Sequence, residues 1–411
     1  MWTKEQKEAI KKLSRLKVGA LFMEMGTGKT RVALDLMASK AHKVKQLLWL
    51  CPCSLKGEIE QERAKWQPDL ALRVIGIETL SASDKTYLEV LESVKERSTF
   101  CVVDESLKIK NLGAKRTKRI LQIGSYCKYR LILNGTPLSK NVLDLWPQME
   151  FLSHKILDMD FRAFKYNYCE FKKEPGRRER IVKNYNLPHL ITKIEPYIFD
   201  SKLYLDIPKN YKTYKYYIDL SLYRAFKNKL FLEEAEYTTG GELMDFSWYK
   251  IITKLQRYYT SSEEHHKELQ NLIKKINEQV VIFVKFISSI PAGALALTGD
   301  TKPEYRQGII NKHKNGEQQA LYVTYGLGAY GLNLQHCHNV IFAEHSWDYA
   351  QRIQAEARIY RMGQTKECNF YDFDCNTGLE RLLHDCNNKK EHLADRVKRE
   401  ITNQKKLKDL L

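Results

Sequence analysis

The chain has 411 residues, 43% of them apolar and 29% charged, which excludes wholesale disorder and leaves room for two or three domains. Its 68 Lys and Arg exceed its 50 Asp and Glu by 18, so a polyanionic partner is favoured, either nucleic acid or an acidic membrane surface. No apolar run approaches the roughly 18–20 residues of a membrane span, and no signal-peptide core follows the N-terminus. The nine cysteines are scattered without a C-x-x-C pair, which predicts a reduced compartment and no zinc site. Since a membrane span and a signal-peptide core are also lacking, we expect a cytoplasmic protein and favour nucleic acid over a membrane as its partner.

The segment 1–150 alternates short apolar and β-branched runs with helical stretches. Five of these runs are predicted strands: Gly19–Met23, Gln46–Cys51, Leu72–Ile75, Phe100–Val103 and Arg130–Leu133. Short buried strands that alternate with helices are typical of a parallel sheet covered on both faces. We therefore expect 1–150 to form an α/β domain.

The middle of the chain, 151–270, has a different composition. Across 161–230 there are 16 Lys and Arg against 7 Asp and Glu, a net charge of +9. This is half of the net charge of +18 of the whole chain. Tyrosines are dense in the same stretch: Tyr166, Tyr168, Tyr185, Tyr211, Tyr214, Tyr216 and Tyr217. Basic residues interleaved with aromatic residues suit a polyphosphate backbone with exposed bases, but a solvated helical linker with packed tyrosines shows the same pattern. We expect a helical, basic insertion or linker, and both interpretations stay open.

The alternation of strands and helices returns late in the chain. Five further runs are predicted strands: Val280–Val284, Ala294–Leu297, Ala320–Thr324, Val340–Ala343 and Asn369–Phe373. This pattern predicts a second parallel-sheet α/β domain over 271–375. The segment 376–411 is helical in pattern and basic at its end, and Thr377 and Glu380 have the spacing of a capping box. We expect it to form a C-terminal helical tail.

An MEMGTGKT segment follows the first predicted strand and precedes a helical pattern, which is the context that a phosphate-binding loop requires. Gly26, Thr27 and Gly28 form the loop, where the glycines let backbone N–H groups turn toward phosphate oxygens. The following helix directs its positive end at the same place. We expect Lys29 to reach the β- and γ-phosphates, and the Thr30 hydroxyl to occupy a Mg²⁺ position.

Two carboxylates follow the fourth predicted strand. Asp104 and Glu105 fit a Mg²⁺-holding aspartate and a water-orienting glutamate, although an acidic strand end is common without any function. Because the phosphate loop precedes them, we predict that Lys29, Asp104 and Glu105 are catalytic. Thr30 and Asp104 are the predicted magnesium ligands.

These residues stand in a series of motifs that is similar to the Snf2-type superfamily-2 motors, a family of DNA-dependent ATPases. In the first half, the matching features are Gln6 ahead of the loop, the strings LCPCSL from Leu50, DESLKIKN from Asp104 and LNGTPL from Leu133, and the DLW string from Asp144. In the second half, they are the string GAYGLNL from Gly328, Trp347, and the string QAEARIYRMGQ from Gln354. The motifs occur in family order over about 5–375.

The resemblance implies two RecA-like domains with ATP and Mg²⁺ in the cleft between them. Gln6 corresponds to the adenine-reading glutamine of the family, and Gly331 and Gln354 correspond to further nucleotide contacts. Arg358 and Arg361 of the second domain correspond to arginine fingers, which neutralise the charge that develops on the γ-phosphate. On a helix, two residues three positions apart lie on the same face. The alternative interpretation is therefore that Arg358 and Arg361 form salt bridges on an exposed helix surface.

The resemblance also implies duplex DNA as the partner, with single-stranded nucleic acid as the alternative. Ser54, Thr136, Thr324 and Trp347 are expected to contact it. Phosphate contacts carry no sequence information, so we expect little sequence specificity and a strong dependence on salt. Closure on ATP and release after hydrolysis would then shift one domain's grip on the duplex relative to the other's. The sequence does not identify a protein partner.

Two residues depart from the family pattern beside Asp104 and Glu105. Ser106 stands where the family has Ala, and Leu107 stands where it has a His that relays hydrolysis to the DNA-contacting motifs. A leucine cannot hydrogen-bond, so we expect the relay to be weaker or to take another route. The leading interpretation is an ATP-dependent duplex-DNA translocase or remodeller. The alternatives are a strand-separating DNA or RNA helicase, and a nucleotide-gated DNA clamp with weak hydrolysis.

Overall fold

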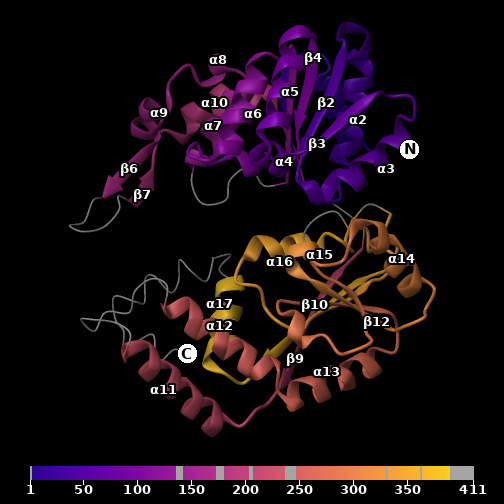
Figure 1. Cartoon of the computed structure of the whole chain (residues 1–411), viewed down its shortest axis with the longest axis vertical. Helices are drawn as coiled ribbons and strands as arrows, with labels where there is room; N and C mark the ends of the chain where they lie inside the picture. Colours follow the sequence, from indigo (N-terminus) through magenta and orange to yellow (C-terminus); the bar gives the residue numbers. More distant parts are fainter. Residues whose placement is uncertain are drawn as a thin grey trace. The chain divides into compact units, whose positions relative to one another are not determined.

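A computed structural model describes residues 2–135, 142–172, 180–202, 207–236, 247–328, 332–361 and 363–388. Its internal contacts divide the chain into two compact units, Met1–Tyr204 and Leu205–Leu411 (Figure 1). Each unit is built on one six-stranded sheet. The predicted fold class, two α/β domains with parallel sheets, is therefore confirmed.

The sheet of the first unit has the strand order β3-β2-β4-β5-β1-β8, and every neighbouring pair is parallel. Its strands are β1 Val18–Met23, β2 Gln46–Cys51, β3 Leu72–Gly76, β4 Thr99–Val103, β5 Tyr129–Asn134 and β8 Ile198–Ser201. The first five confirm the predicted strands of this half. Because the carboxyl ends of parallel strands meet at one edge, the segments that follow β1, β4 and β5 leave the sheet on the same side.

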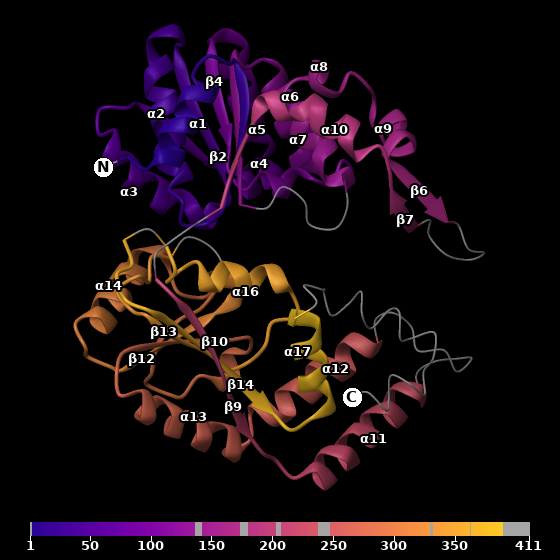
Figure 2. The ribbon, with the colours of Figure 1, turned by 180° about the vertical axis from the view of Figure 1, so that it is seen from behind.

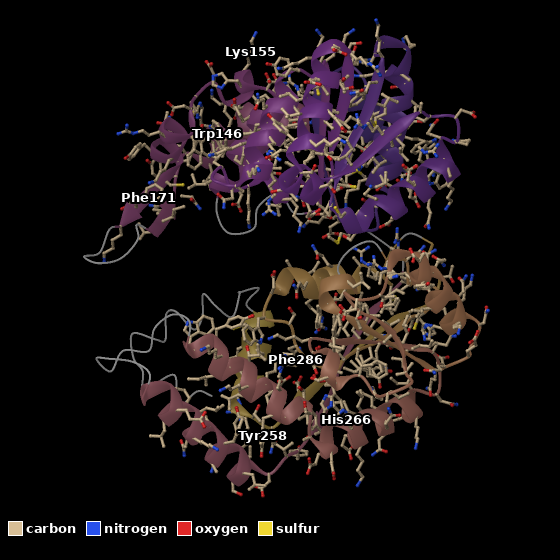
Figure 3. The ribbon with its side chains drawn as sticks, in the orientation of Figure 1. Trp146, Lys155, Phe171, Tyr258, His266 and Phe286 are labelled. Atoms are coloured by element: carbon tan, nitrogen blue, oxygen red, sulfur yellow. The ribbon has the colours of Figure 1, made fainter. Side chains whose placement is uncertain are left out.

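Helices cover both faces of this sheet (Figures 1 and 2). They are α1 Lys4–Leu13, α2 Lys29–Lys40, α3 Lys56–Trp66, α4 Ile77–Ala82, α5 Asp84–Glu96, α6 Lys115–Ser125, α7 Leu145–Leu152, α8 His154–Leu157, α9 Phe161–Tyr168 and α10 Leu187–Ile194. Short 3₁₀ turns lie between them: η1 Ala41–Lys43, η2 Cys53–Leu55, η3 Ser106–Ile109, η4 Val142–Asp144 and η5 Glu195–Tyr197. An antiparallel pair, β6 Cys169–Lys172 and β7 Arg180–Asn184, follows α9. Trp146 of α7 and Phe171 of β6 both pack on the core of this unit (Figure 3).

The sheet of the second unit has the strand order β11-β12-β10-β13-β14-β9, again with parallel neighbours. Its strands are β9 Lys209–Tyr216, β10 Val280–Val284, β11 Leu295–Leu297, β12 Ala320–Thr324, β13 Asn339–Phe342 and β14 Cys368–Cys375. Its helical elements are α11 Leu220–Glu236, α12 Ser247–Thr260, α13 Glu263–Ile276, η6 Ile287–Ser289, α14 Pro303–Lys314, α15 Tyr325–Gly328, α16 Tyr349–Glu356 and α17 Gly378–Asn388. The five strands predicted for this half are confirmed. The start of the helix predicted after Thr377 is confirmed by α17, and the Thr377 hydroxyl accepts from the Glu380 N–H at 3.2 Å. The rest of the predicted tail, 389–411, lies outside the described residues.

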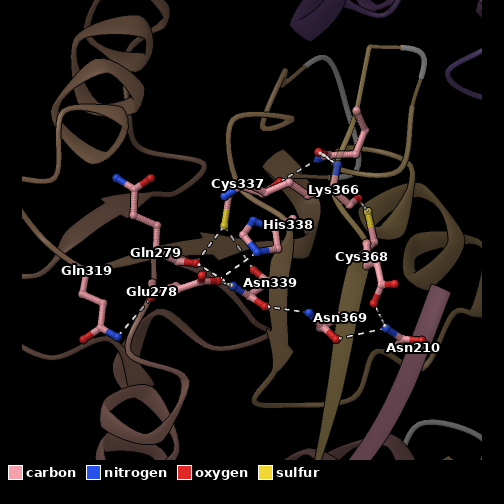
Figure 4. A network of polar contacts seen from close by, with 12 residues as sticks. Asn210, Glu278, Gln279, Gln319, Cys337, His338, Asn339, Lys366, Cys368 and Asn369 are labelled. Atoms are coloured by element: carbon pink, nitrogen blue, oxygen red, sulfur yellow. Dashed lines mark hydrogen bonds and ion pairs between the residues drawn. The ribbon is translucent and has the colours of Figure 1, made fainter. Parts of the chain in front are cut away.

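A chain of amides joins the amino ends of three neighbouring strands in the second unit (Figure 4). Asn339 of β13 donates to Glu278 at 3.0 Å and accepts from Asn369 of β14 at 3.1 Å. Asn369 in turn accepts from Asn210 of β9 at 3.4 Å. These side-chain bonds fix the register of the strands at this edge.

The middle segment 151–270 is largely helical, as expected, but it also contributes one strand to each sheet. β8 pairs with β1 in the first unit, and β9 pairs with β14 over eight residues in the second. The division of the chain by contacts falls inside this segment, and the domain boundaries predicted at 150, 270 and 375 stay predictions. Both interpretations of its tyrosines apply, because Tyr168 and Tyr216 are buried whereas Tyr166 and Tyr217 are exposed.

All nine cysteines lie among the described residues, and none forms a disulfide. Eight are buried and Cys53 is exposed. Across the ranges that the structure describes, no helix combines the length and the apolar character that crossing a bilayer would need.

Candidate functional site

The phosphate loop predicted from the sequence connects β1 to α2. Gly26 and Gly28 have φ angles of 82° and 76°, in the left-handed region that glycine tolerates best. Helix α2 begins directly afterwards, at Lys29, and its first turn contains no acidic residue. Lys29 and Thr30 are half-buried at this helix end. The backbone therefore directs the N–H groups of the first turn and the positive end of a 12-residue helix to the same point.

Two side chains hold the loop in shape. The Thr27 hydroxyl donates to the Glu24 carbonyl at 2.7 Å, which closes the turn. The Gln6 amide donates to the Thr27 carbonyl at 2.9 Å, while its oxygen accepts from the Thr3 N–H at 3.2 Å. Gln6 is 1% exposed, so both ends of its amide are occupied by the protein in this structure. It positions the loop, and its contact with adenine stays a prediction.

The predicted carboxylate pair lies at the end of β4. Asp104 is 3% exposed, and one of its oxygens accepts from the Glu105 N–H at 2.9 Å. Burial raises the pKa of Asp104 to about 7; the Glu105 carboxylate adds to the rise, and the positive charge of Lys29 opposes it. Glu105 has a φ of 51°, which is uncommon for a residue with a side chain. The fold therefore holds a buried, poorly compensated carboxylate within electrostatic reach of Lys29.

An aromatic stack beside the loop has no counterpart among the sequence predictions. The Arg31 guanidinium lies between two indole rings, 3.9 Å from the centroid of Trp2 and 3.7 Å from that of Trp66. The stack joins Trp2, two residues ahead of α1, to the first turn of α2 and the end of α3. No pattern in the sequence signals it, because its three residues come from distant segments. Cation–π contacts of this kind contribute roughly 0.5–2 kcal/mol each, so the stack stabilises the helix start that carries Lys29.

In the second unit, the structure corrects the helical placement of the predicted arginine fingers. Helix α16 ends at Glu356, so Arg358 and Arg361 lie in the turns that follow it rather than on one helical face. Arg358 is 8% exposed and donates to the Leu332 carbonyl at 3.5 Å. Arg361 is half-buried. The two guanidinium groups therefore have different environments.

An ion-pair network does exist on α16, but a different arginine forms it. Arg352 is 7% exposed, donates to the Glu356 carboxylate at 2.9 Å, and contacts the Asp372 carboxylate. Its guanidinium lies 3.5 Å from the centroid of the Phe342 ring. The i, i+4 spacing of Arg352 and Glu356 was the available sequence signal. Arg352 therefore forms a buried ion-pair network on this helix, and the roles of Arg358 and Arg361 stay predictions.

The two glutamines that flank the arginines have different surroundings. The Gln364 amide donates to the carbonyls of Gln335 and Cys337, both at 3.1 Å, so it ties the turn to the segment ahead of β13. Gln354 is half-buried, and its Oε1 atom is buried without a hydrogen-bond partner among the described residues. An orphaned buried oxygen of this kind is available to a ligand.

The predicted nucleic-acid residues are divided between the two units, with Ser54 and Thr136 in the first and Thr324 and Trp347 in the second. Ser54 is half-buried in η2, and Thr324 is 9% exposed at the end of β12. Thr136, and the predicted nucleotide contact Gly331, lie outside the described residues. Their roles stay predictions.

Trp347 lies inside the second unit and is 7% exposed. Its indole N–H donates to Gln256 at 2.7 Å, and the Lys285 ammonium lies 3.1 Å from its ring centroid. Burial lowers the pKa of Lys285 to about 6, although the Glu344 carboxylate opposes this. These contacts support a packing role for Trp347, and its contact with DNA stays a prediction.

Comparison with known families gives one match in each unit. A model described as the SNF2-related domain matches residues 50–202, and one described as the helicase conserved C-terminal domain matches residues 264–363. Both matched segments contain motifs that the sequence analysis singled out.

Individual relatives share only low sequence identity with this chain. An uncharacterized ATP-dependent helicase of Mycoplasma pneumoniae is 25% identical over 92% of this chain and 40% of its own length. The TATA-binding protein-associated factor mot1 of Schizosaccharomyces pombe is 23% identical over 92% of this chain and 25% of its own length. The chain therefore spans less than half of either protein. A solved SWI2/SNF2 ATPase core of Sulfolobus solfataricus, in complex with dsDNA, is 21% identical with a TM-score of 0.45 and covers 95% of this chain and 91% of its own.

Proposed function

We propose that this chain is a Snf2-type, helicase-like ATPase, which hydrolyses ATP to ADP and phosphate on duplex DNA and translocates along it; the matches to the SNF2-related and helicase C-terminal domains support this. The observation that carries the proposal is the arrangement at the carboxyl edge of the first sheet. Lys29 follows β1, and the Asp104–Glu105 pair follows β4, yet Lys29 acts electrostatically on Asp104. A lysine on a glycine loop beside a buried carboxylate is what a Mg²⁺-triphosphate site needs.

Each residue of this edge has a proposed role. The backbone N–H groups of the loop and the Lys29 ammonium bind the phosphates. Glu105 orients the attacking water. Because Asp104 is buried beside another carboxylate, its charge is stabilised when a cation or the Lys29 ammonium lies next to it.

The donor set at this edge fits Mg²⁺. The Thr30 hydroxyl and the Asp104 carboxylate are hard oxygen ligands, which Mg²⁺ prefers together with water and phosphate oxygens. A divalent ion would also relieve the uncompensated burial of the Asp104 charge. When bound, Mg²⁺ supplies electrostatic stabilisation of the charge on the transferred phosphoryl group.

We assign the second unit a supporting role in catalysis. Arg361, and Arg358 after it is released from the Leu332 carbonyl, would supply positive charge to the γ-phosphate. The orphaned Gln354 oxygen and the backbone at Gly331 would contact the nucleotide. Gln6 would reach adenine by exchanging its bond to Thr27.

The proposed partner is duplex DNA, and the support for it is the net charge of +18 together with the family. Ser54, Thr136 and Thr324 are the proposed contacts with the DNA backbone, and Trp347 is a further proposed contact with DNA. Single-stranded nucleic acid is the alternative partner. Such contacts would bind without sequence preference and would weaken steeply as salt is added.

A phosphate-release assay on the full chain tests the proposal, with duplex DNA, single-stranded DNA and RNA added in turn. We expect duplex DNA to stimulate turnover most, and Lys29→Ala to abolish turnover while leaving DNA binding intact. Greater stimulation by RNA would favour the strand-separating helicase. ATP-dependent retention on DNA with negligible phosphate release would favour the clamp, which the leucine at position 107 supports. Normal turnover by Lys29→Ala would refute the site itself.

A further inference from the structure

Three polar side chains form a hydrogen-bonded chain inside the apolar core of the first unit. Ser106 and Gln148 are 0% exposed and Asn134 is 2% exposed. The Ser106 hydroxyl donates to the Gln148 amide oxygen at 2.6 Å and accepts from the Asn134 amide at 3.5 Å. The Gln148 amide also donates to the Asp144 carbonyl at 2.8 Å. The chain therefore connects η3, the end of β5 and helix α7.

Residues close to the three in the chain, namely Val103, Ile109, Ile132 and Met149, belong to the hydrophobic core of this unit. A buried polar group that loses its partner destabilises the fold, whereas replacing both partners by apolar groups of similar shape is often close to neutral. A satisfied network is thus no more stable than an apolar one. What it adds is a fixed geometry among the three elements that it joins.

The element fixed in this way is the turn that carries the predicted water-orienting carboxylate. Glu105 precedes Ser106 and has the left-handed φ of 51°, a conformation that persists only where the surroundings enforce it. Its N–H is bound by Asp104 at 2.9 Å, and its carbonyl accepts from the Lys108 N–H at 2.8 Å. The Ser106 side chain anchors the same turn to α7 from the core side.

The other end of the network reaches the neighbouring strand. Asn134 is the last residue of β5, the strand that lies between β1 and β4 in the sheet. Any shift of the Glu105 turn would therefore pull on the carboxyl end of β5 through the Ser106 hydroxyl. Leu107, the neighbouring side chain, has no hydrogen-bonding group with which to do the same.

We propose that Ser106, Asn134 and Gln148 are positioning residues, which hold Glu105 in its hydrolysis-competent conformation and couple it to the end of β5. The inference rests on the proposed function, because it assigns a role in ATP turnover. The three residues touch neither the nucleotide nor the reacting water in this assignment. They act through Glu105 alone.

The test compares Ser106→Ala with the double variant Ser106→Ala/Gln148→Met in the duplex-stimulated ATPase assay. Met approximates the shape of Gln without its amide, so the double variant replaces the main bond by an apolar contact. We expect Ser106→Ala to lower kcat about tenfold with the KM for ATP changed less than about twofold, since one positioning bond is lost. The double variant should recover part of the lost unfolding midpoint, because the Asn134 amide still loses the Ser106 hydroxyl as an acceptor, and it should not recover kcat.

The matched control is Ser93→Ala. Ser93 also donates its hydroxyl to a glutamine oxygen, that of Gln46 at 2.5 Å, but it does so at the amino end of β2. The Ser93→Ala variant should leave kcat unchanged. Wild-type kcat in Ser106→Ala, or recovery of kcat together with stability in the double variant, would overturn the inference while leaving the proposed function intact. A wild-type chain that releases no phosphate with any nucleic acid would overturn both.

Discussion

Replacing the buried carboxylate of Asp104 by an amide should stabilise the protein while it destroys activity. The amide introduced by Asp104→Asn is uncharged at any pH, but it keeps an oxygen for the Glu105 N–H that Asp104 now binds. An amide oxygen is a poor substitute for a carboxylate at a Mg²⁺ site, so ATP turnover should be lost. The substitution therefore separates two effects of the Asp104 charge, namely its cost to the stability of the fold and its contribution to ATP turnover.

The magnitude follows from the pKa of Asp104, which burial, then the Glu105 carboxylate, raise from 3.8 to about 7. Below the unfolded pKa both states bind the proton. As the pH rises toward 7, the unfolded chain releases the proton and the folded chain retains it, so the free energy of unfolding falls. The full shift corresponds to a ceiling of about 4 kcal/mol above pH 7. Movement of the Lys29 ammonium toward the carboxylate would stabilise the charged form and lower this ceiling. We therefore expect the free energy of unfolding to differ by about 2 kcal/mol between the variant and the wild type at high pH.

The assay is urea unfolding without metal or nucleotide, carried out at about pH 4.5 and about pH 8. Four of the six tryptophans lie in the first unit, so indole fluorescence reports mainly on the unit that contains Asp104. We expect Asp104→Asn to be more stable than the wild type at the higher pH, with most of the difference gone at the lower pH. A variant that is less stable at pH 8, or a difference that does not depend on pH, would refute the reasoning.

Asp84 offers a control of opposite sign. Hydrogen bonds from Lys115, at 2.7 Å, and from Arg119 lower the pKa of this exposed carboxyl to about 2. Its favourable effect is present above the unfolded pKa and is lost as the pH falls through the folded value. Asp84→Asn should therefore destabilise the protein at neutral pH, and the difference should shrink in acid.

The remaining predictions concern turnover and DNA binding. Glu105→Gln should bind ATP normally but lower phosphate release by at least about a hundredfold, leaving ATP-bound protein on duplex DNA in a filter-binding assay. Arg361→Ala should lose DNA-stimulated turnover with near-normal nucleotide affinity, whereas Arg358→Ala should also lower the unfolding midpoint because Arg358 is 8% exposed. Lost folding in Arg361→Ala would instead show that Arg361 has a structural role. DNA affinity should fall linearly on a log–log plot against salt, and a flat plot would exclude phosphate contacts as its basis.

Local sequence patterns were enough to predict those elements whose backbone conformation and burial depend on neighbouring residues. All ten predicted strands are present, because a buried parallel strand must be apolar on both faces and therefore stands out as a continuous run. The phosphate loop was predictable for a similar reason, since glycine is the residue that best tolerates the φ angles of Gly26 and Gly28. Strands β8 and β9 were missed because they are short or polar and lie at sheet edges, where a continuous apolar run is not required.

The arginine motif shows where a local rule fails. Spacing of three residues implies a shared face only while the helix continues, and α16 ends at Glu356 before either Arg358 or Arg361. The helix end is set by packing, since Leu334 donates its N–H to the Arg358 carbonyl from a distant part of the chain. No window of sequence around the motif contains that partner.

The residue types that can bind a triphosphate, the order of the motifs and the two-sheet class of the protein can all be predicted from the sequence. The burial of Asp104 within reach of Lys29, the bond between Ser106 and Gln148, and the packing of Trp347 inside its unit become visible in the folded chain. Backbone conformation and strand burial depend on neighbouring residues, whereas desolvation, charge coupling and side-chain hydrogen bonds depend on which distant segments the fold brings together.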